Sequence, residues 1–145
     1  MLVYLDNCCF NRPYDDQSHA NIFLETQAKL YIQENILNGK YRLIWSYILQ
    51  FENDQNPYPN HKREIRKWKA NASLLVSASA EIIDKAKHYQ SLGLHAKDAL
   101  HCACAISVEA DYFVTTDKQL IRVACKLAGL KVVNPLTFIQ EEVDS

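Results

Sequence analysis

Glycine is scarce in this chain. Only three glycines occur among 145 residues, Gly39, Gly93 and Gly129, and we expect each to lie at the end of a helix or strand. A Walker-type loop that holds nucleotide triphosphates needs several glycines close together. The sequence therefore excludes that class of nucleotide site.

Paired cysteine motifs are also absent. The five cysteines are odd in number and show no CxxC spacing, so we expect reduced thiols and no disulfide framework. Cys102, Cys104 and Cys125 lie among alanines and leucines, where cysteine packs as a small hydrophobe. A zinc site from Cys102, Cys104 and His101 is disfavoured, because helix residues one or two apart point in different directions.

Strong net charge is missing as well. With 16 basic and 17 acidic residues the formal charge is -1, so affinity for a polyanion must come from local patches or bound cations. The first residues enter a predicted strand interrupted by Asp6, without the basic start and long apolar stretch of a secretory signal. We expect a cytoplasmic protein without membrane association.

The length and apolar content suit one compact domain, residues 1–145, with 48% hydrophobic residues. Strand and helix patterns alternate, which predicts a three-layer α/β/α sandwich around a central parallel sheet of four to five strands. We expect strands at 2–5, 40–45, 112–115 and 131–133. A loop is expected at 7–14. The first helix should run from Asp15 to Leu37, with Ala20, Phe23, Leu30 and Leu37 on its apolar face. Further helices are expected from Ser46 to before Pro57, over 61–69, around Ile82 to Gly93, over 96–108, over 117–129 and after Pro135.

Four acidic residues carry the chemical signal. Asp6 and Asp117 end apolar runs, and ligands bind beyond the carboxyl ends of parallel strands. Taken singly, Asp117 could be only a helix N-cap, Asp6 could bond its own turn, and Glu52 could be solvated. Asp98 lies in a helix rich in alanine and cysteine, where burial of a carboxylate costs free energy unless a cation compensates it.

Taken together, the acids predict a cation site. Clusters of carboxylate oxygens suit Mg²⁺ or Mn²⁺, which bridge substrate phosphates. One or two such ions can support in-line hydrolysis of a phosphodiester, the scheme common in nucleases. Bound cations would also allow an acidic pocket to accept RNA.

The basic residues have two interpretations each. Arg12 could contact a phosphate, although pairing with Asp15 or Asp16 is favoured. Between His61 and Lys69, Lys62, Arg66 and Lys69 share one helical face and are candidates for RNA contact, whereas Ile65 and Trp68 more simply pack inward. His101, three residues after Asp98, could approach a metal or phosphate, but a hydrogen-bonded core histidine is commoner.

The ordered set of motifs resembles the PIN-domain family, close to VapC-type ribonuclease toxins. The matching pieces are the first strand ending in Asp6, Ser46 followed by Glu52, the segment Lys97-Asp98-Ala99-Leu100-His101, and Val114-Thr115-Thr116-Asp117. They cover nearly the whole chain. The family commonly has Ser or Asn two residues after the first aspartate, where this chain has Cys8.

The resemblance implies an endoribonuclease dependent on Mg²⁺ or Mn²⁺, with Asp6, Glu52, Asp98 and Asp117 as metal ligands. It implies that the Thr115 hydroxyl orients the site. It also implies RNA as substrate, a small antitoxin protein as partner and a homodimer. The alternative from another functional class is a catalytically silent PIN module that binds RNA or a protein.

Overall fold

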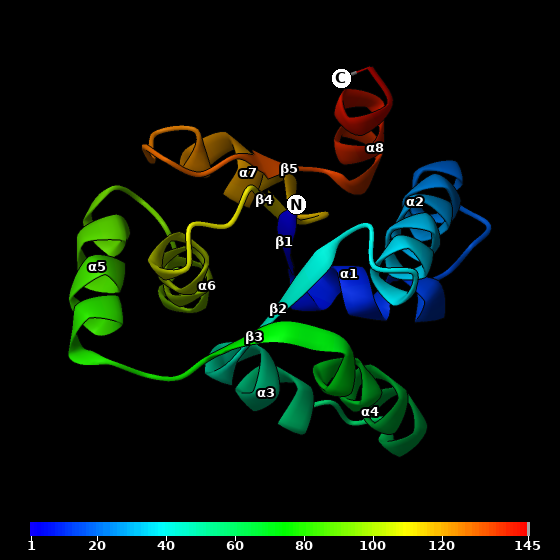
Figure 1. Ribbon diagram of the computed structural model, residues 1–145, viewed down its shortest axis with the longest axis horizontal. Coiled ribbons are helices and arrows are strands. Elements are labelled where there is room, and N and C mark those ends of the chain that lie inside the picture. The colour runs from blue at the N-terminus through cyan, green and yellow to red at the C-terminus, as the bar shows by residue number, and fades with distance from the viewer. Residues whose placement is uncertain (145) are drawn as a thin grey trace.

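A sheet of five parallel strands forms the centre of the computed structural model, which describes residues 1–144 (Figure 1). The sheet order is β3-β2-β1-β4-β5. The strands are β1 (Leu2–Leu5), β2 (Arg42–Ser46), β3 (Ala72–Val76), β4 (Tyr112–Val114) and β5 (Val132–Val133).

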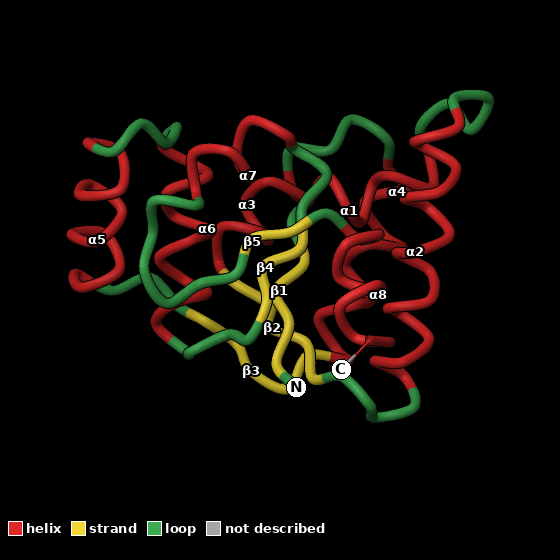
Figure 2. Tube along the Cα trace, turned by 90° about the horizontal axis from the view of Figure 1, so that it is seen from above, coloured by secondary structure: helices red, strands yellow, loops and turns green. Residues whose placement is uncertain are grey.

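Helices cover both faces of this sheet. The α-helices are α1 (Asn7–Asn11), α2 (Ala20–Leu37), α3 (Tyr47–Asp54), α4 (Pro59–Arg66), α5 (Ala80–Ser91), α6 (Ala96–Ser107), α7 (Lys118–Ala124) and α8 (Pro135–Asp144), and the 3-10 helices are η1 (Arg12–Tyr14) and η2 (Lys67–Asn71). Both views place α5 and α6 on one side of the sheet and α1, α2 and α8 on the other (Figure 2). The predicted three-layer α/β/α architecture is confirmed. No described helix combines the length and apolar character that a membrane span requires.

The strand order determines where a ligand site belongs. From β1 the chain builds outward through β2 to β3, then crosses back to place β4 on the other side of β1. The order therefore reverses between β1 and β4. In open α/β sheets, the crevice beyond the carboxyl ends of the strands at such a reversal binds ligands. Asp6 follows β1 there, and Thr115 follows β4.

The core explains why β1 reads as an uninterrupted apolar run. Val3, Tyr4 and Leu5 are fully buried because both faces of the sheet are covered. The Tyr4 ring stacks on Phe113 of β4, with centroids 5.0 Å apart. On α6, Ala99 and Ala103 are also fully buried, and these small side chains let the helix lie close to the sheet.

Helix α2 differs from its prediction in both start and orientation. It begins at Ala20 and not at Asp15. The preceding segment, residues 7–14, was predicted as a loop but forms α1 and η1. Phe23, Leu30 and Leu37 are 47%, 44% and 63% exposed, so the predicted apolar face points outward. The inner face carries Ile32 and Ile36 with several polar residues, of which Glu25 accepts from Arg12 and Asn134 and Thr26 donates to the Arg12 carbonyl. The positions buried on α2 are Glu25, Thr26, Ala28, Lys29, Ile32, Gln33, Asn35 and Ile36.

Three smaller predictions were also wrong. β3 was missed, because its edge position leaves a weak pattern in which Leu75 is 62% exposed. α7 ends at Ala124 and does not extend to Gly129. Cys125 was expected to pack as a small hydrophobe, but it is exposed because it follows the end of α7. The other cysteine predictions are confirmed: all five are free thiols, and Cys102 and Cys104 are buried.

Candidate functional site

Asp6 is held from several directions where β1 passes into α1. Its backbone N–H donates to the Val114 carbonyl at 2.9 Å, which ties it to the end of β4. Its Oδ1 accepts the Asn7 N–H at 2.8 Å as the N-cap of α1, and its Oδ2 accepts the Thr115 hydroxyl at 2.8 Å. The Cys8 thiol also donates to Oδ2, at 3.4 Å. Cys8 therefore places a polar atom on Asp6, although it is not the expected Ser or Asn.

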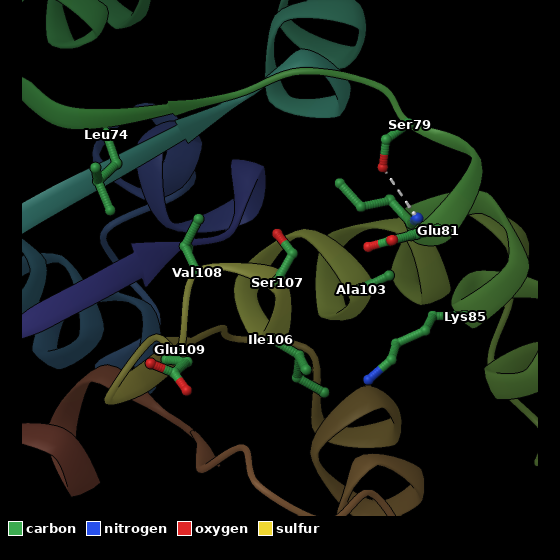
Figure 3. A pocket seen from close by; sticks show the side chains of 10 residues that line it. Leu74, Ser79, Glu81, Lys85, Ala103, Ile106, Ser107, Val108 and Glu109 are labelled. Carbon is green, nitrogen blue, oxygen red and sulfur yellow. Dashed lines mark hydrogen bonds between the residues drawn. The ribbon is translucent and has the colours of Figure 1, made fainter.

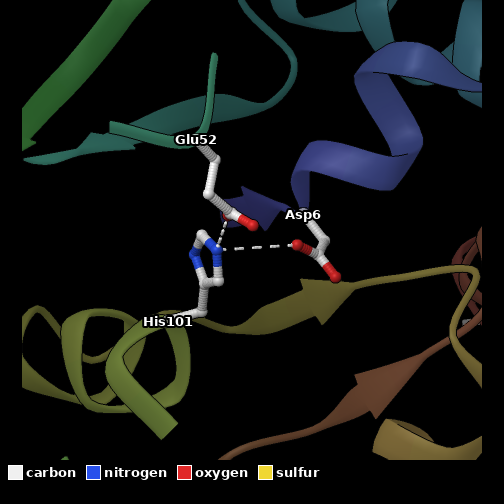
Figure 4. A group of neighbouring side chains, drawn as sticks. All are labelled: Asp6, Glu52 and His101. Carbon is white, nitrogen blue, oxygen red and sulfur yellow. Dashed lines mark hydrogen bonds and ion pairs between the residues drawn. The ribbon is translucent and has the colours of Figure 1, made fainter. Parts of the chain in front are cut away.

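Three side chains from separate elements meet at this point (Figure 4). Asp6 comes from the end of β1, Glu52 from α3 and His101 from α6, and their ligand atoms lie within 4.8 Å of one another. His101 Nε2 forms a hydrogen bond with Glu52 Oε1 and lies 3.8 Å from Asp6 Oδ1. We call these three residues the Asp6–Glu52–His101 cluster.

The other ring nitrogen of His101 is fixed from the core. Its Nδ1 lies 2.5 Å from the Tyr4 hydroxyl, which lies 2.6 Å from the Ser46 hydroxyl. Ser46 Oγ also accepts the Leu49 N–H at 3.2 Å, so it caps α3 as predicted. This chain of contacts sets the angle of the imidazole and, through α3, the position of Glu52.

Opposite charges make His101 a favourable place for a proton. Desolvation by burial lowers its pKa, but the hydrogen bond to Glu52 and the charges of Asp6, Glu52 and Asp98 outweigh burial and raise it. In the imidazolium form both ring nitrogens donate, to Glu52 and to Tyr4. The two sequence interpretations of His101 therefore both apply: it is a buried core histidine and a member of the acidic site.

Asp98 is coupled to this cluster by charge. It lies half-buried in the first turn of α6, where burial, and then the charges of Asp6 and Asp117, raise its pKa to about 6. With Asp117 it lines a small cavity of about 90 Å³. The sequence argument that Asp98 carries a desolvation cost agrees with this shift.

Asp117 and Thr115 form the β4 side of the site. Asp117 is exposed and is the N-cap of α7, since its Oδ1 accepts the N–H groups of Gln119 and Leu120 at 3.0 and 3.1 Å. Thr115 is fully buried, and while its hydroxyl donates to Asp6 it also accepts the Asp117 N–H at 3.1 Å. Thr115 therefore links two of the predicted acids.

The donor set suits a divalent cation. The carboxylates of Asp6 and Glu52 converge within reach of a single ion, with the His101 ring beside them and the charge of Asp98 nearby. The sequence predicted four carboxylates; the structure places Asp6 and Glu52 together with His101 and leaves Asp98 and Asp117 outside that tight group. The spacing of His101 three residues after Asp98 was the signal for its membership. Cys102 and Cys104 of the disfavoured zinc trio are buried in the core.

The predicted basic residues lie on η1, α4 and η2. Arg12 is engaged by Glu25, through Nε at 3.0 Å and Nη2 at 2.8 Å, and by Asp15 at 3.0 Å. The favoured pairing with Asp15 is thus present, and Glu25 is a partner that the sequence did not reveal. Lys62 and Arg66 lie on α4, whereas Lys69 falls in η2, whose 3-10 geometry breaks the predicted common face.

Ile65 and Trp68 behave as the simpler interpretation predicted. Ile65 is buried at the end of α4, and Trp68 is half-buried against the core. RNA contact by Lys62, Arg66 and Lys69 stays a prediction.

A larger cavity of about 680 Å³ lies between α5, α6 and β3 (Figure 3). Its walls include Leu74, Ile82 and Ile106 with charged groups at the rim, and none of the predicted site residues lines it. It adjoins Ser107 at the last turn of α6, whereas Asp98 lies in the first turn. This cavity is separate from the acidic site.

The raised pKa values of Asp98 and His101 predict how the stability of the metal-free protein depends on pH. The folded state holds the Asp98 proton more tightly than the unfolded chain, so this contribution is fully present below the ordinary pKa of 3.8 and is lost as pH rises through about 6. The His101 contribution is present below its ordinary value of 6.5 and is lost as pH rises through its raised pKa. We expect the free energy of unfolding, measured by urea titration in chelator, to fall from about pH 4.5 to about pH 7.

The matched variant for this measurement is Asp98→Asn, which removes one of the two titrating groups. Its free energy of unfolding should fall less over the same pH range. Identical slopes in the two proteins would contradict the assignment to Asp98.

No family model matches this chain, and no curated protein matches it. Among solved structures, one chain in the crystal structure of VapBC2 from Rickettsia felis, bound to a DNA fragment from their promoter, matches with a TM-score of 0.58. The match covers 92% of this chain and 98% of that chain, at 13% sequence identity. At this identity the likeness establishes a shared fold.

Proposed function

We propose that this protein is a PIN-domain endoribonuclease of the VapC type, which hydrolyses RNA phosphodiester bonds with the help of Mg²⁺ or Mn²⁺. The observation that carries the proposal is the meeting of Asp6, Glu52 and His101 beyond the strand ends where the sheet order reverses. Groups far apart in the sequence converge there into a donor set that suits a divalent ion. The fold shared with a VapBC2 chain supports the same conclusion.

Asp6 and Glu52 would hold the ion, with Asp98 and Asp117 extending the acidic lining toward β4. When bound, the ion would polarise a phosphoryl oxygen and favour attack by water. Thr115 keeps the Asp6 carboxylate in place through its 2.8 Å hydrogen bond. Tyr4 and Ser46 fix His101, which in turn orients Glu52. Supporting contacts of this kind hold ligands in the required geometry.

The neighbouring structure also bears on partners. It holds VapBC2 with a fragment of promoter DNA. We propose that this protein has a small antitoxin partner and forms a homodimer in the cytoplasm, as the resemblance to VapC-type toxins implies. Co-expression with the product of an adjacent short reading frame, followed by co-purification, tests the first part.

The central test is metal-dependent cleavage of RNA. Purified protein is incubated with mixed-sequence single-stranded RNA and Mg²⁺ or Mn²⁺, and the products are resolved on a denaturing gel. We expect cleavage that stops in excess chelator and returns when metal is added back. The variant Asp84→Asn, which changes an exposed acid on α5, is the control for general charge effects and should cleave like the wild type.

Cleavage that persists in chelator would contradict the proposal. RNA binding without turnover on any substrate would favour the catalytically silent PIN module.

A further inference from the structure

A second cavity adjoins the acidic site on the side of α3. It measures about 350 Å³, and Glu52 of the Asp6–Glu52–His101 cluster lines it. Its other walls come from α1, from the segment that joins α3 to α4, and from the first turn of α6. The lining residues are Asn7, Asn11, Glu52, Gln55, Asn56, Pro57, Tyr58 and Lys97. A group bound at the acids could therefore place an attached group directly in this space.

The amide side chains of this cavity are tied to one another. Asn56 Nδ2 donates to Asn11 Oδ1 at 3.1 Å, and Asn11 Nδ2 donates to the Asn7 carbonyl at 3.0 Å. Asn56 Oδ1 accepts the Tyr58 N–H at 3.0 Å and so fixes the start of the aromatic segment. Preorganised amides offer both donors and acceptors, which is what the edge of a nucleobase requires.

An aromatic surface continues from the cavity. Tyr58 is 61% exposed, and its ring centroid lies 4.9 Å from that of His61. The other neighbour of His61 is Tyr14, whose ring stacks on it at 3.7 Å with an interplanar angle of 7°. Tyr58 therefore presents a supported ring at the cavity wall. Exposed aromatic rings of this kind are platforms for unpaired bases.

Positive charge flanks this aromatic surface. Lys97 lies on the α6 wall of the cavity, with its ammonium 5.7 Å from the centre of the half-exposed Phe51 ring. Lys62, Arg63 and Arg66 follow His61 on α4. Cations beside stacking rings are the combination that tracks a single-stranded backbone.

We infer that this cavity is a nucleobase subsite: it takes the base of a nucleotide beside the cleaved phosphate, stacks it on Tyr58, and directs the single strand over α4. The inference rests on the proposed function for its choice of RNA as ligand. A base can enter only if it is unpaired, so the subsite selects single-stranded RNA. Tyr58 is here a specificity-determining residue and is separate from the acids that hold the ion.

The first test measures binding of a fluorescein-labelled single-stranded RNA by anisotropy, with Ca²⁺ in place of Mg²⁺. Tyr58→Ala should raise Kd by at least about five-fold, since stacking of one base is removed. Tyr58→Phe keeps the ring and should bind like the wild type. Tyr31→Ala removes an exposed tyrosine on α2, outside the cavity, and should also leave Kd unchanged.

The second test identifies the base itself. One abasic nucleotide is moved stepwise along the RNA, and in the wild type one position should weaken binding more than its neighbours. In Tyr58→Ala that position should lose its special effect, which a merely structural role of Tyr58 would not produce. A perfectly paired duplex of the same sequence should bind more weakly than the single strand.

An unchanged Kd in Tyr58→Ala, an abasic series without a preferred position, or equal affinity for duplex RNA would each overturn the subsite. These outcomes are independent of turnover. RNA binding that depends on Tyr58, without any cleavage, would contradict the proposed nuclease activity and support the subsite. Metal-dependent cleavage with a Kd that does not change in Tyr58→Ala would support the nuclease activity and contradict the subsite.

Discussion

The variant Asp6→Asn is expected to lose nearly all RNA cleavage while keeping the wild-type fold. Asparagine matches aspartate in shape and can still accept the Asn7 N–H through its Oδ1, so the start of α1 should be preserved. It lacks the negative charge that a divalent ion requires. Removing a group that only supports a metal ligand costs about 10- to 100-fold in activity, so removing the ligand should lower kcat/KM by more than about 100-fold.

The measurement compares kcat/KM of the two proteins on one RNA, with circular dichroism as the check on folding. Thr115→Val is the graded companion, because it keeps the Asp6 carboxylate and removes the hydroxyl that donates to it and accepts the Asp117 N–H. The kcat/KM of Thr115→Val should fall by about 10- to 100-fold. If Asp6→Asn cleaves at the wild-type rate, the acids are not the catalytic site.

The variant His101→Leu is expected to destabilise the metal-free protein strongly. The His101 side chain is buried, and Asp6 and Glu52 next to it are only 9% and 19% exposed. Leucine fills similar space but leaves both carboxylates close together without the imidazolium, and the Tyr4 hydroxyl keeps only Ser46 of its two partners. Breaking a buried ion pair on one side costs about 3–5 kcal/mol, a large part of the stability of a small domain.

Urea unfolding in chelator measures this loss, and His88→Leu on the exposed side of α5 is the matched control, with an expected change below about 0.5 kcal/mol. Added Mn²⁺ should restore part of the stability of His101→Leu, because a cation can again neutralise Asp6 and Glu52. A loss of less than about 1 kcal/mol in chelator would show that His101 does not hold these acids together.

Much of the architecture was predictable because buried parallel strands leave a strong local pattern. Residues 2–5 form an unbroken apolar run, and the run at 112–114 ends at the same edge of the sheet. The edge strand β3 was missed, since only one of its faces is covered and its apolar run is short. The orientation of α2 was also missed. Its Glu25 is buried because Arg12 pairs with it, and no helical period in the sequence reveals that partnership.

The site was predictable in part for a related reason. The location of an acid at the end of a strand, such as Asp6, follows from the strand itself. Ser46, as a predicted N-cap, indicated the helix that carries Glu52. The role of His101 depends on the rotation of α6 against the sheet and on the Tyr4 hydroxyl that meets its ring. Tyr4 and His101 are 97 positions apart in the sequence, so local spacing does not reveal their contact.

The sequence by itself determined the alternation of strands and helices, the order of the acids along the chain and the absence of a glycine-rich phosphate loop, because these depend on residue type and local spacing. Only the tertiary structure decided that His101 joins Asp6 and Glu52, that Asp117 lies at the exposed rim, and that Arg12 pairs with Glu25. The physical reason is that ion pairs, burial and the pKa of Asp98 depend on distances across the fold, which are set by packing and not by neighbours in the chain.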